Sequence, residues 1–373
     1  MGVASWLELV VPAPAFIAQR PQLQSVLVSL ERQMHRTSQC RSLASSAMIF
    51  PSILETPPTL HLERIRGSIL ALAVGDALGA TNEFRTVQQI EEGPPVTELI
   101  GGGWLALAAG EITDDTQMTR CVLQSYAHGY SLEDVAARFV MWLETDPPDV
   151  GILTRQALAH VQRGISPREA GRIAWERSGF SSAGNGAIMR CAPTGALRLH
   201  DREARVFETV EIARLTHFDQ RCVESSLWQN ACIAALIAGR SVTASLELAA
   251  SEVIWARNAC DLLLPAVEND VLEWVKQAHD LPISLLDTSG YTLATAQVGA
   301  WALLHADTLE AGLIVVTNQG GDADTTGAVA GALLGAKFGA AAIPKRWLEA
   351  LLCRSQLEEL IAAAVRQVAH HTD

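Results

Sequence analysis

The 373-residue sequence predicts a domain built from α-helices. From Leu62 onward, apolar residues recur at intervals of three and four, which is the period of one helix face. The period-two alternation of apolar and polar residues that would indicate strands is missing there. Hydrophobic residues make up 49% of the chain and charged residues 18%, so a large core can be buried. We therefore predict one all-α domain over residues 60–373, too long for a simple four-helix bundle.

Short breaks of Gly, Pro or Asp divide this region into successive helices. In chain order they are ERIRGSILALAVGDALGA (63–80), DTQMTRCVLQSYAHG (115–129), SLEDVAARFVMWLET (131–145), VGILTRQALAHVQRG (150–164), SPREAGRIAWERSG (166–179), REARVFETVEIARLTH (202–217), QRCVESSLWQNACIAALIAG (220–239), TLATAQVGAWALLHA (292–306) and IPKRWLEALL (343–352). A further helix, rich in Ala and Gly, is predicted to follow GGDADTT (320–326).

Two of these helices carry a small residue at every fourth position, which places the small residues nearly along one helix face. The two stripes are Gly67, Ala71, Gly75, Gly79 and Gly327, Gly331, Gly335, Gly339. Glycine inside a helix costs about 0.5–1 kcal/mol relative to alanine, so a compensating interaction is expected. We predict that both helices are central and pack tightly against their neighbours.

Residues 1–59 differ from the rest of the chain. Proline-punctuated stretches flank one amphipathic segment, LQSVLVSLERQMHR (23–36), which is a candidate helix. We interpret residues 1–59 as an N-terminal extension. It could be a mobile arm, a partner-binding segment, or sequence upstream of the true start, since Met48 could also initiate translation.

Composition excludes several classes of protein. The formal net charge is −13 and no basic stripe is present, which argues against binding to nucleic acid or anionic membranes. The seven cysteines are isolated and odd in number, so neither a disulfide framework nor a zinc site is indicated, and a reducing cytoplasm fits best. No apolar run is long enough to span a membrane, and the N-terminus lacks the basic region of a secretory signal.

Acidic residues cluster where helices are predicted to begin or end. The clusters are Asp76 with Glu83, then Thr113, Asp114 and Asp115, and finally Asp322, Asp324 and Thr325. One interpretation is helix capping. Asp114 and Gln117 would form a capping box, and Asp322 or Asp324 would cap the glycine-striped helix that follows them.

A second interpretation is a metal site, because capping needs one oxygen whereas each of the last two clusters offers two carboxylates and a hydroxyl. Hard cations such as Mg²⁺ and Mn²⁺ take up to six oxygen ligands of these kinds. Converging carboxylates would repel one another and raise their pKa values unless a cation lay between them. We therefore predict a dinuclear metal centre formed by the two clusters.

Seven stretches, in this order, resemble the ADP-ribosylglycohydrolase family related to the dinitrogenase-reductase-activating glycohydrolase. They are RIRGSILALAVGDALGATNEF, GGGWLALAAGEITDDTQM, DVGILTRQAL, SSAGNGAIMRCAP, LTHFDQRCVESSLWQNACIAALI, SGYTLATAQVGAWALL and VVTNQGGDADTTGAVAGALLGAKFGAAAIPKRWLEAL. The joint presence of GDALG, TDDTQM, GNGAIMR and GGDADTTGA makes the match specific. The resemblance implies a compact, orthogonal multi-helix domain.

The resemblance also implies roles for particular residues. The ligands of two Mg²⁺ or Mn²⁺ ions would be Thr113, Asp114, Asp115, Asp322, Asp324 and Thr325. The catalytic candidates are Asp114, Glu83 and Asp115, with Asp114 and Glu83 expected to transfer protons. The residues expected to bind the diphosphate, ribose and nucleotide are Ser182, Gly184, Asn185, Gly186 and His217.

The activity implied is removal of ADP-ribose from modified protein side chains, with ADP-ribosyl-arginine favoured and ADP-ribosyl-serine as second choice. The implied partners are an ADP-ribosylated protein and ADP-ribose. An alternative is an immunity protein that binds an ADP-ribosylating toxin through residues 1–59, with or without hydrolysis. A catalytically silent relative, as in eye lens crystallins, and another metallohydrolase such as a phosphatase are further alternatives. The intact ligand set argues against the first of these and the GNGAIMR motif against the second.

Overall fold

The computed structural model describes residues 58–259 and 270–369, which belong to one compact unit, Glu55–Asp373. Within these ranges the structure contains helices and no strand, apart from two isolated β-bridges that pair Gly102 with Leu107 and Gly184 with Tyr291. The predicted all-α fold is confirmed.

The first half of the unit holds α3 (Pro58–Gly79), α4 (Val87–Glu91), α5 (Asp114–Ala127), α6 (Leu132–Leu143), α7 (Ile152–Gln162), α8 (Pro167–Arg177), η1 (Ile188–Arg190), α9 (Ala192–Leu197) and α10 (Arg202–Arg214). The second half holds α11 (Gln220–Ile237), α12 (Val242–Ala259), α13 (Val271–Gln277), η2 (Ile283–Leu285), α14 (Thr292–His305), α15 (Leu309–Thr317), α16 (Ala323–Phe338), η3 (Ala340–Ala342), α17 (Lys345–Ala350) and α18 (Arg354–Ala369).

Within the described residues, every helix predicted from the sequence is present, with ends that differ by a few residues. The prediction did not include α4, α9, α12, α13, α15 or α18. The signal for α18 was available, because Leu357, Ile361 and Ala364 are its buried residues and follow the helical period.

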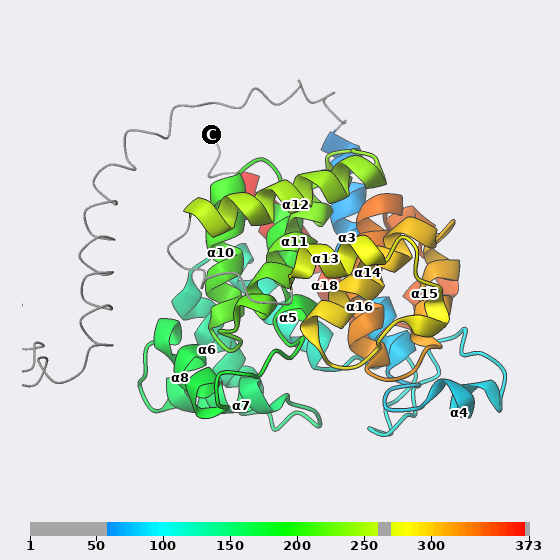
Figure 1. Ribbon diagram of the computed structural model, residues 1–373, viewed down its shortest axis with the longest axis horizontal. Helices are drawn as coiled ribbons and strands as arrows, with labels where there is room; N and C mark the ends of the chain where they lie inside the picture. Colours follow the sequence, from blue (N-terminus) through cyan, green and yellow to red (C-terminus); the bar gives the residue numbers. More distant parts are fainter. Residues whose placement is uncertain (1–57, 260–269, 370–373) are drawn as a thin grey trace, which may run out of the picture. The chain divides into compact units, whose positions relative to one another are not determined.

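The two glycine-striped helices, α3 and α16, run side by side through the middle of the unit (Figure 1). A Cβ atom added to Gly75 would lie 2.0 Å from the carbonyl oxygen of Gly327, and one added to Gly335 would lie 2.0 Å from that of Gly67. The stripes therefore face each other in antiparallel register, as the prediction of tight packing required. One detail was wrong: Gly339 is the C-cap of α16, with a φ of +82°, and not part of the helix interior. The antiparallel register places the end of α3 beside the beginning of α16.

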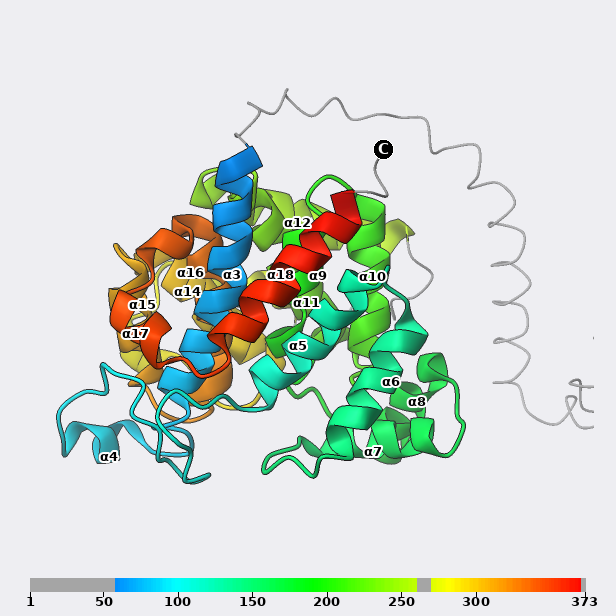
Figure 2. The same ribbon diagram turned by 180° about the vertical axis from the view of Figure 1, so that it is seen from behind.

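Other helices pack around this pair, whereas α6, α7 and α8 lie to one side of it (Figure 1). In Figure 1, α14 and α15 flank α16 while α12 lies across α11, and Figure 2 shows α18 crossing beside α3 and α5 on the opposite face. One large apolar core runs through these elements, with Trp228 of α11 and Trp347 of α17 among its largest fully buried side chains. The core holds the beginnings of α5 and α16 at the same end of α3.

Several predictions concern parts of the chain outside the described residues. The candidate helix 23–36 and most of the predicted extension, residues 1–57, lie there, so the boundary at residue 59 stays a prediction. The five cysteines within the described residues are buried and free of disulfides. Among the described helices, none combines the length and the apolar character that a bilayer crossing needs.

Candidate active site

A pocket of about 430 Å³ brings together residues from widely separated parts of the sequence. Most of the residues predicted from the sequence line it: Glu83, Asp114, Ser182, Gly184, Asn185, Gly186, His217, Asp322, Asp324 and Thr325. The other two, Thr113 and Asp115, are buried beside it. Two clusters about 200 residues apart in the sequence thus meet at one place.

The start of α5 is capped by a residue from another helix. Asp76 of α3 is fully buried, and its carboxylate accepts hydrogen bonds from the backbone amides of Thr113 and Thr116 at 3.0 and 3.1 Å and from both hydroxyls. The capping box proposed for Asp114 and Gln117 is absent, because the N-cap is Thr113 and makes no side-chain capping bond. Since Asp76 serves as the cap, the Asp114 and Asp115 carboxylates are released for another role.

At the start of α16, too, the carboxylate nearest the helix N-terminus is not used for capping. Asp322 occupies the N-cap position but makes no side-chain capping bond. Its Oδ2 instead accepts a hydrogen bond from the side-chain amide of Asn185 at 2.8 Å, and that amide also donates to Thr295. The alternative in which Asp322 simply caps the glycine-striped helix is therefore wrong. Asn185 orients Asp322, a contact that the sequence did not predict, and it also lines the pocket where a substrate contact is expected for it.

Direct contacts join the two clusters. The Thr325 hydroxyl donates to Asp115 Oδ2 at 3.3 Å, and the Thr113 hydroxyl oxygen, whose proton is donated to Asp76, lies 3.3 Å from the same carboxylate oxygen. The backbone amide of Phe84 donates to the Gly321 carbonyl at 2.6 Å, and the Gly321 amide donates to Arg85 at 2.9 Å. This pairing places Glu83 next to the beginning of α16.

The pocket is strongly acidic for physical reasons that the structure makes explicit. Burial raises the pKa values of Asp114, Asp115 and Asp324 well above their usual range, and neighbouring carboxylates raise them further. Burial also raises the pKa of Glu83 to about 8, although a hydrogen bond from Trp104 opposes this shift. The pocket contains more negative charge than it can hold unprotonated without a counter-charge.

The donor set fits a hard divalent cation. One oxygen each from Glu83, Asp322 and Asp324 can be chosen such that all three lie within 4.8 Å of one another. In addition, Asp115 Oδ1 is buried and lacks a hydrogen-bond partner among the described residues. An orphaned carboxylate oxygen is costly unless a ligand completes its coordination. Carboxylate and hydroxyl oxygens are the ligands that Mg²⁺ and Mn²⁺ prefer.

The loop 181–186 forms the opposite wall of the pocket. Its backbone pairs with the segment before α14: the Asn185 amide donates to Gly290 at 3.1 Å, and the Thr292 amide donates to Ala183 at 3.1 Å. The loop leads into η1, a three-residue 3₁₀ turn. An anion bound here would rely on individual N–H groups more than on a helix dipole.

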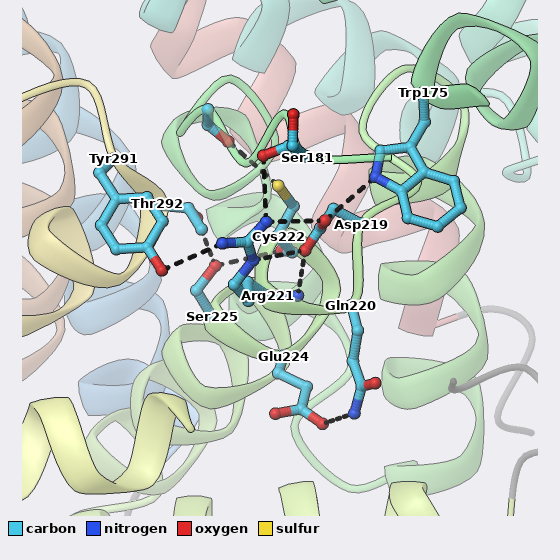
Figure 3. Close-up of polar contacts among 11 residues, drawn as sticks. Trp175, Ser181, Asp219, Gln220, Arg221, Cys222, Glu224, Ser225, Tyr291 and Thr292 are labelled. Atoms are coloured by element: carbon cyan, nitrogen blue, oxygen red, sulfur yellow. Dashed lines mark hydrogen bonds and ion pairs between the residues drawn. The ribbon is translucent and has the colours of Figure 1, made fainter. Parts of the chain in front are cut away.

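Arg221, near the start of α11, holds this loop in place (Figure 3). Its guanidinium donates to the Ser181 carbonyl at 3.1 Å and to the Tyr291 hydroxyl at 3.4 Å. Asp219 neutralises the guanidinium at 2.8 Å and also accepts from the indole of Trp175 at 3.0 Å. The loop is thereby connected to α8, α11 and α14.

His217 lies beneath the same loop. A Cβ added at Gly186 would lie 2.6 Å from a carbon of the imidazole, so this position requires glycine. Burial, assisted by the nearby Arg190 cation, lowers the pKa of His217 to about 3 and keeps the ring neutral. Its Nδ1 lies 2.7 Å from the hydroxyl of Thr216, which in turn accepts from the fully buried Arg190.

Four residues that shape the site were not predicted from the sequence in that role. Asp76 was recognised as acidic but not as a cap, and Asp149, Trp104 and Arg190 were not singled out. Asp149 lines the pocket, and Arg190 supplies a buried positive charge near Asp114. All four lie within the stretches that carry the resemblance, which was the available signal, but their roles depend on tertiary contacts.

The fold and the acidic pocket define a helical protein with a carboxylate-lined pocket at one end of its two central helices. The chain belongs to the ADP-ribosylglycohydrolase family, whose model matches residues 56–373. The resemblance seen in the sequence is thus confirmed.

Individual relatives agree with this assignment. The chain is 34% identical to the ADP-ribosyl-(dinitrogen reductase) glycohydrolase of Rhodospirillum rubrum over 322 residues, which cover 83% of this chain and 99% of that protein. It is 29% identical to the ADP-ribosylarginine hydrolase Tri1 of Pseudomonas putida (strain GB-1), covering 81% and 78%. A solved structure described as an ADP-ribosylglycohydrolase-related protein complex superposes with a TM-score of 0.66 at 31% identity, covering 83% of this chain and 99% of that chain.

Proposed function

We propose that this protein removes ADP-ribose from ADP-ribosylated arginine side chains of proteins by hydrolysis that depends on two divalent cations. The observation that carries the proposal is the meeting of the 113–115 and 322–325 clusters in one pocket, opposite the loop 181–186. Membership of the ADP-ribosylglycohydrolase family supplies the reaction class. The two relatives whose names specify a substrate or linkage support a protein-bound ADP-ribose.

The cation ligands would be the oxygens of Thr113, Asp114, Asp115, Asp322, Asp324 and Thr325. Bound Mg²⁺ or Mn²⁺ would act as a Lewis acid toward the ribose hydroxyls and would offset the repulsion among the carboxylates. The protein prepares this site in advance. Asp76 fixes the start of α5, Asn185 orients Asp322, and the close contact of α3 with α16 sets the spacing of the two clusters.

Proton transfer is assigned to Glu83 and Asp114. Hydrolysis breaks the bond between C1″ of the ribose and the guanidine nitrogen and forms a bond from C1″ to a water oxygen. One water proton passes to a carboxylate, and the departing guanidine nitrogen gains a proton. Both carboxylates line the pocket, and the raised pKa of Glu83, about 8, suits a group that accepts and returns a proton near neutral pH.

The loop 181–186 and His217 would hold the diphosphate and the nucleotide. Arg221 fixes the loop through its hydrogen bond to the Ser181 carbonyl, and the neutral imidazole of His217 packs against Gly184 and Gly186. These contacts position the distal part of the substrate while the acidic cluster handles the ribose next to the scissile bond.

The proposal is tested by incubating the protein with ADP-ribosyl-arginine and ADP-ribosyl-serine peptides, with Mg²⁺, Mn²⁺ or EDTA. We expect ADP-ribose release from the arginine peptide, stimulated by either cation and suppressed by EDTA. Glu83→Gln should slow release, whereas Asp280→Asn, which removes an exposed charge, should not. Release from the serine peptide alone would show that the linkage is wrong, and release from neither peptide would refute the function.

A further inference from the structure

We propose that Trp104 is a positioning residue for Glu83, with its indole N–H fixing the orientation of the Glu83 carboxylate in the acidic pocket. The inference deepens the proposed function and rests on it. Trp104 Nε1 donates a hydrogen bond to Glu83 Oε2 at 2.6 Å. The indole is half-exposed, whereas Glu83 is buried. Trp104 therefore reaches Glu83 from outside the pocket.

Backbone contacts hold Trp104 against the segment that carries Glu83. Gly102 and Leu107 exchange two backbone hydrogen bonds, at 2.8 and 2.9 Å, which close a short hairpin. Gly103 has a φ of +65°, and a Cβ there would lie 2.2 Å from the Ala80 carbonyl oxygen. The Thr81 hydroxyl donates to the Gly101 carbonyl at 2.9 Å. The hairpin is thus fixed to Ala80 and Thr81, three and two residues before Glu83, independently of the Trp104–Glu83 bond.

Glu83 needs such a partner because no helix constrains it. It lies in the turn between α3 and α4, and the next residue, Phe84, has a φ of +59°, which bulky residues rarely adopt. The Phe84 ring packs against Trp104 with centroids 5.3 Å apart. Repulsion from Asp322 acts on the Glu83 carboxylate, and the charge-assisted hydrogen bond from Trp104 opposes displacement.

The bond also limits what Glu83 can do. With Oε2 engaged by the indole, one carboxylate oxygen remains for water or substrate. A single presented oxygen favours directional proton transfer over two-oxygen chelation of a cation. Trp104 accordingly contributes to turnover through Glu83 and not through contact with substrate, since Trp104 is not among the residues that line the pocket.

The test replaces Trp104 by 3-benzothienylalanine, which keeps the shape of the ring and substitutes sulfur for the N–H. For release from an ADP-ribosyl-arginine peptide, we expect kcat to fall about 10- to 100-fold, with KM changed less than about threefold. The matched control is the same replacement at Trp301, whose indole donates to the Leu281 carbonyl at 3.0 Å. That variant should keep kcat within about twofold.

A second comparison uses a Glu83→Ala background. If Trp104 acts only through Glu83, its replacement should lower the residual rate less than about twofold there. An equal loss in both backgrounds, or no loss in the otherwise unchanged protein, would overturn the positioning role. If the unchanged protein itself released no ADP-ribose, the proposed function would fail, which is a separate result.

Discussion

Replacing Asp324 by asparagine should stabilise the metal-free protein while removing most of its response to metal. Asp324 is buried, and one of its oxygens lies within 4.8 Å of an oxygen from Glu83 and from Asp322. Two unit charges at that distance repel by about 3.5 kcal/mol at an effective dielectric constant of about 20. Asparagine keeps the Oδ1 that accepts the Thr325 amide at 2.9 Å, so the local backbone bond survives.

The net gain should be smaller than the sum of these pairwise repulsions, because burial and neighbouring carboxylates raise the pKa values of Asp324 and Glu83 and so favour their uncharged forms. We expect about 1–3 kcal/mol, or roughly 2–6 °C in Tm, for a domain of this size in EDTA. A cation at 100 times its Kd stabilises the unchanged protein by about 2.7 kcal/mol, and the variant should lose most of this gain.

The assay is thermal unfolding in EDTA and across a Mn²⁺ titration. The control is Asp280→Asn, which removes the same charge from a side chain that is 90% exposed and should match the unchanged protein in both conditions. A lower Tm for Asp324→Asn in EDTA, together with a full Mn²⁺ response, would refute the placement of Asp324 in a cation site.

Three other substitutions test different parts of the structure. Gly75→Ala should lower stability by about 1–3 kcal/mol in urea unfolding, because the new methyl would lie 2.0 Å from the Gly327 carbonyl; unchanged stability would contradict the close packing. His217→Gln should weaken the fall of stability at acid pH. Because the folded-state pKa is about 3, neutral histidine stabilises the fold fully above about pH 6.5, and this contribution is lost as pH falls toward 3. Tm measured from pH 7 to 4 checks this, and Tm curves of the variant and the unchanged protein that run parallel would contradict it. Arg221→Gln should raise KM several-fold by loosening the loop 181–186, with the Mn²⁺ response of Tm unchanged; an unaltered KM would contradict the supporting role.

Features that depend on residues close in sequence were predictable, whereas features that depend on residues distant in sequence were not. Helices are local, so the three- and four-residue period located α5, α11 and α16, and the glycine stripes predicted the α3–α16 contact because close backbone approach admits only small residues. The capping box at Asp114 was wrong for the opposite reason: the capping carboxylate comes from Asp76, which lies 37 residues before Thr113. No local pattern reveals that a distant carboxylate will satisfy the amides of Thr113 and Thr116.

For the site as well, residue types were predictable from the sequence and tertiary contacts were not. Residue types and the family resemblance located both acidic clusters, yet Asn185 emerged as a partner of Asp322 only from the tertiary structure. Trp104 likewise acquires meaning from its contact with Glu83, 21 residues earlier. Ligand chemistry is visible in sequence, whereas the groups that orient the ligands belong to other elements and depend on how those elements pack.

The most direct test of the central claim is the number of Mn²⁺ ions bound by the metal-free protein, titrated while ADP-ribose release from an arginine-linked peptide is followed. We predict that two ions bind per chain and that release rises as they bind. Asp115→Asn and Asp324→Asn should each lose both the ion binding and the release. Full release in the presence of EDTA, or both variants retaining two bound ions and normal turnover, would contradict a cation centre formed by the 113–115 and 322–325 clusters.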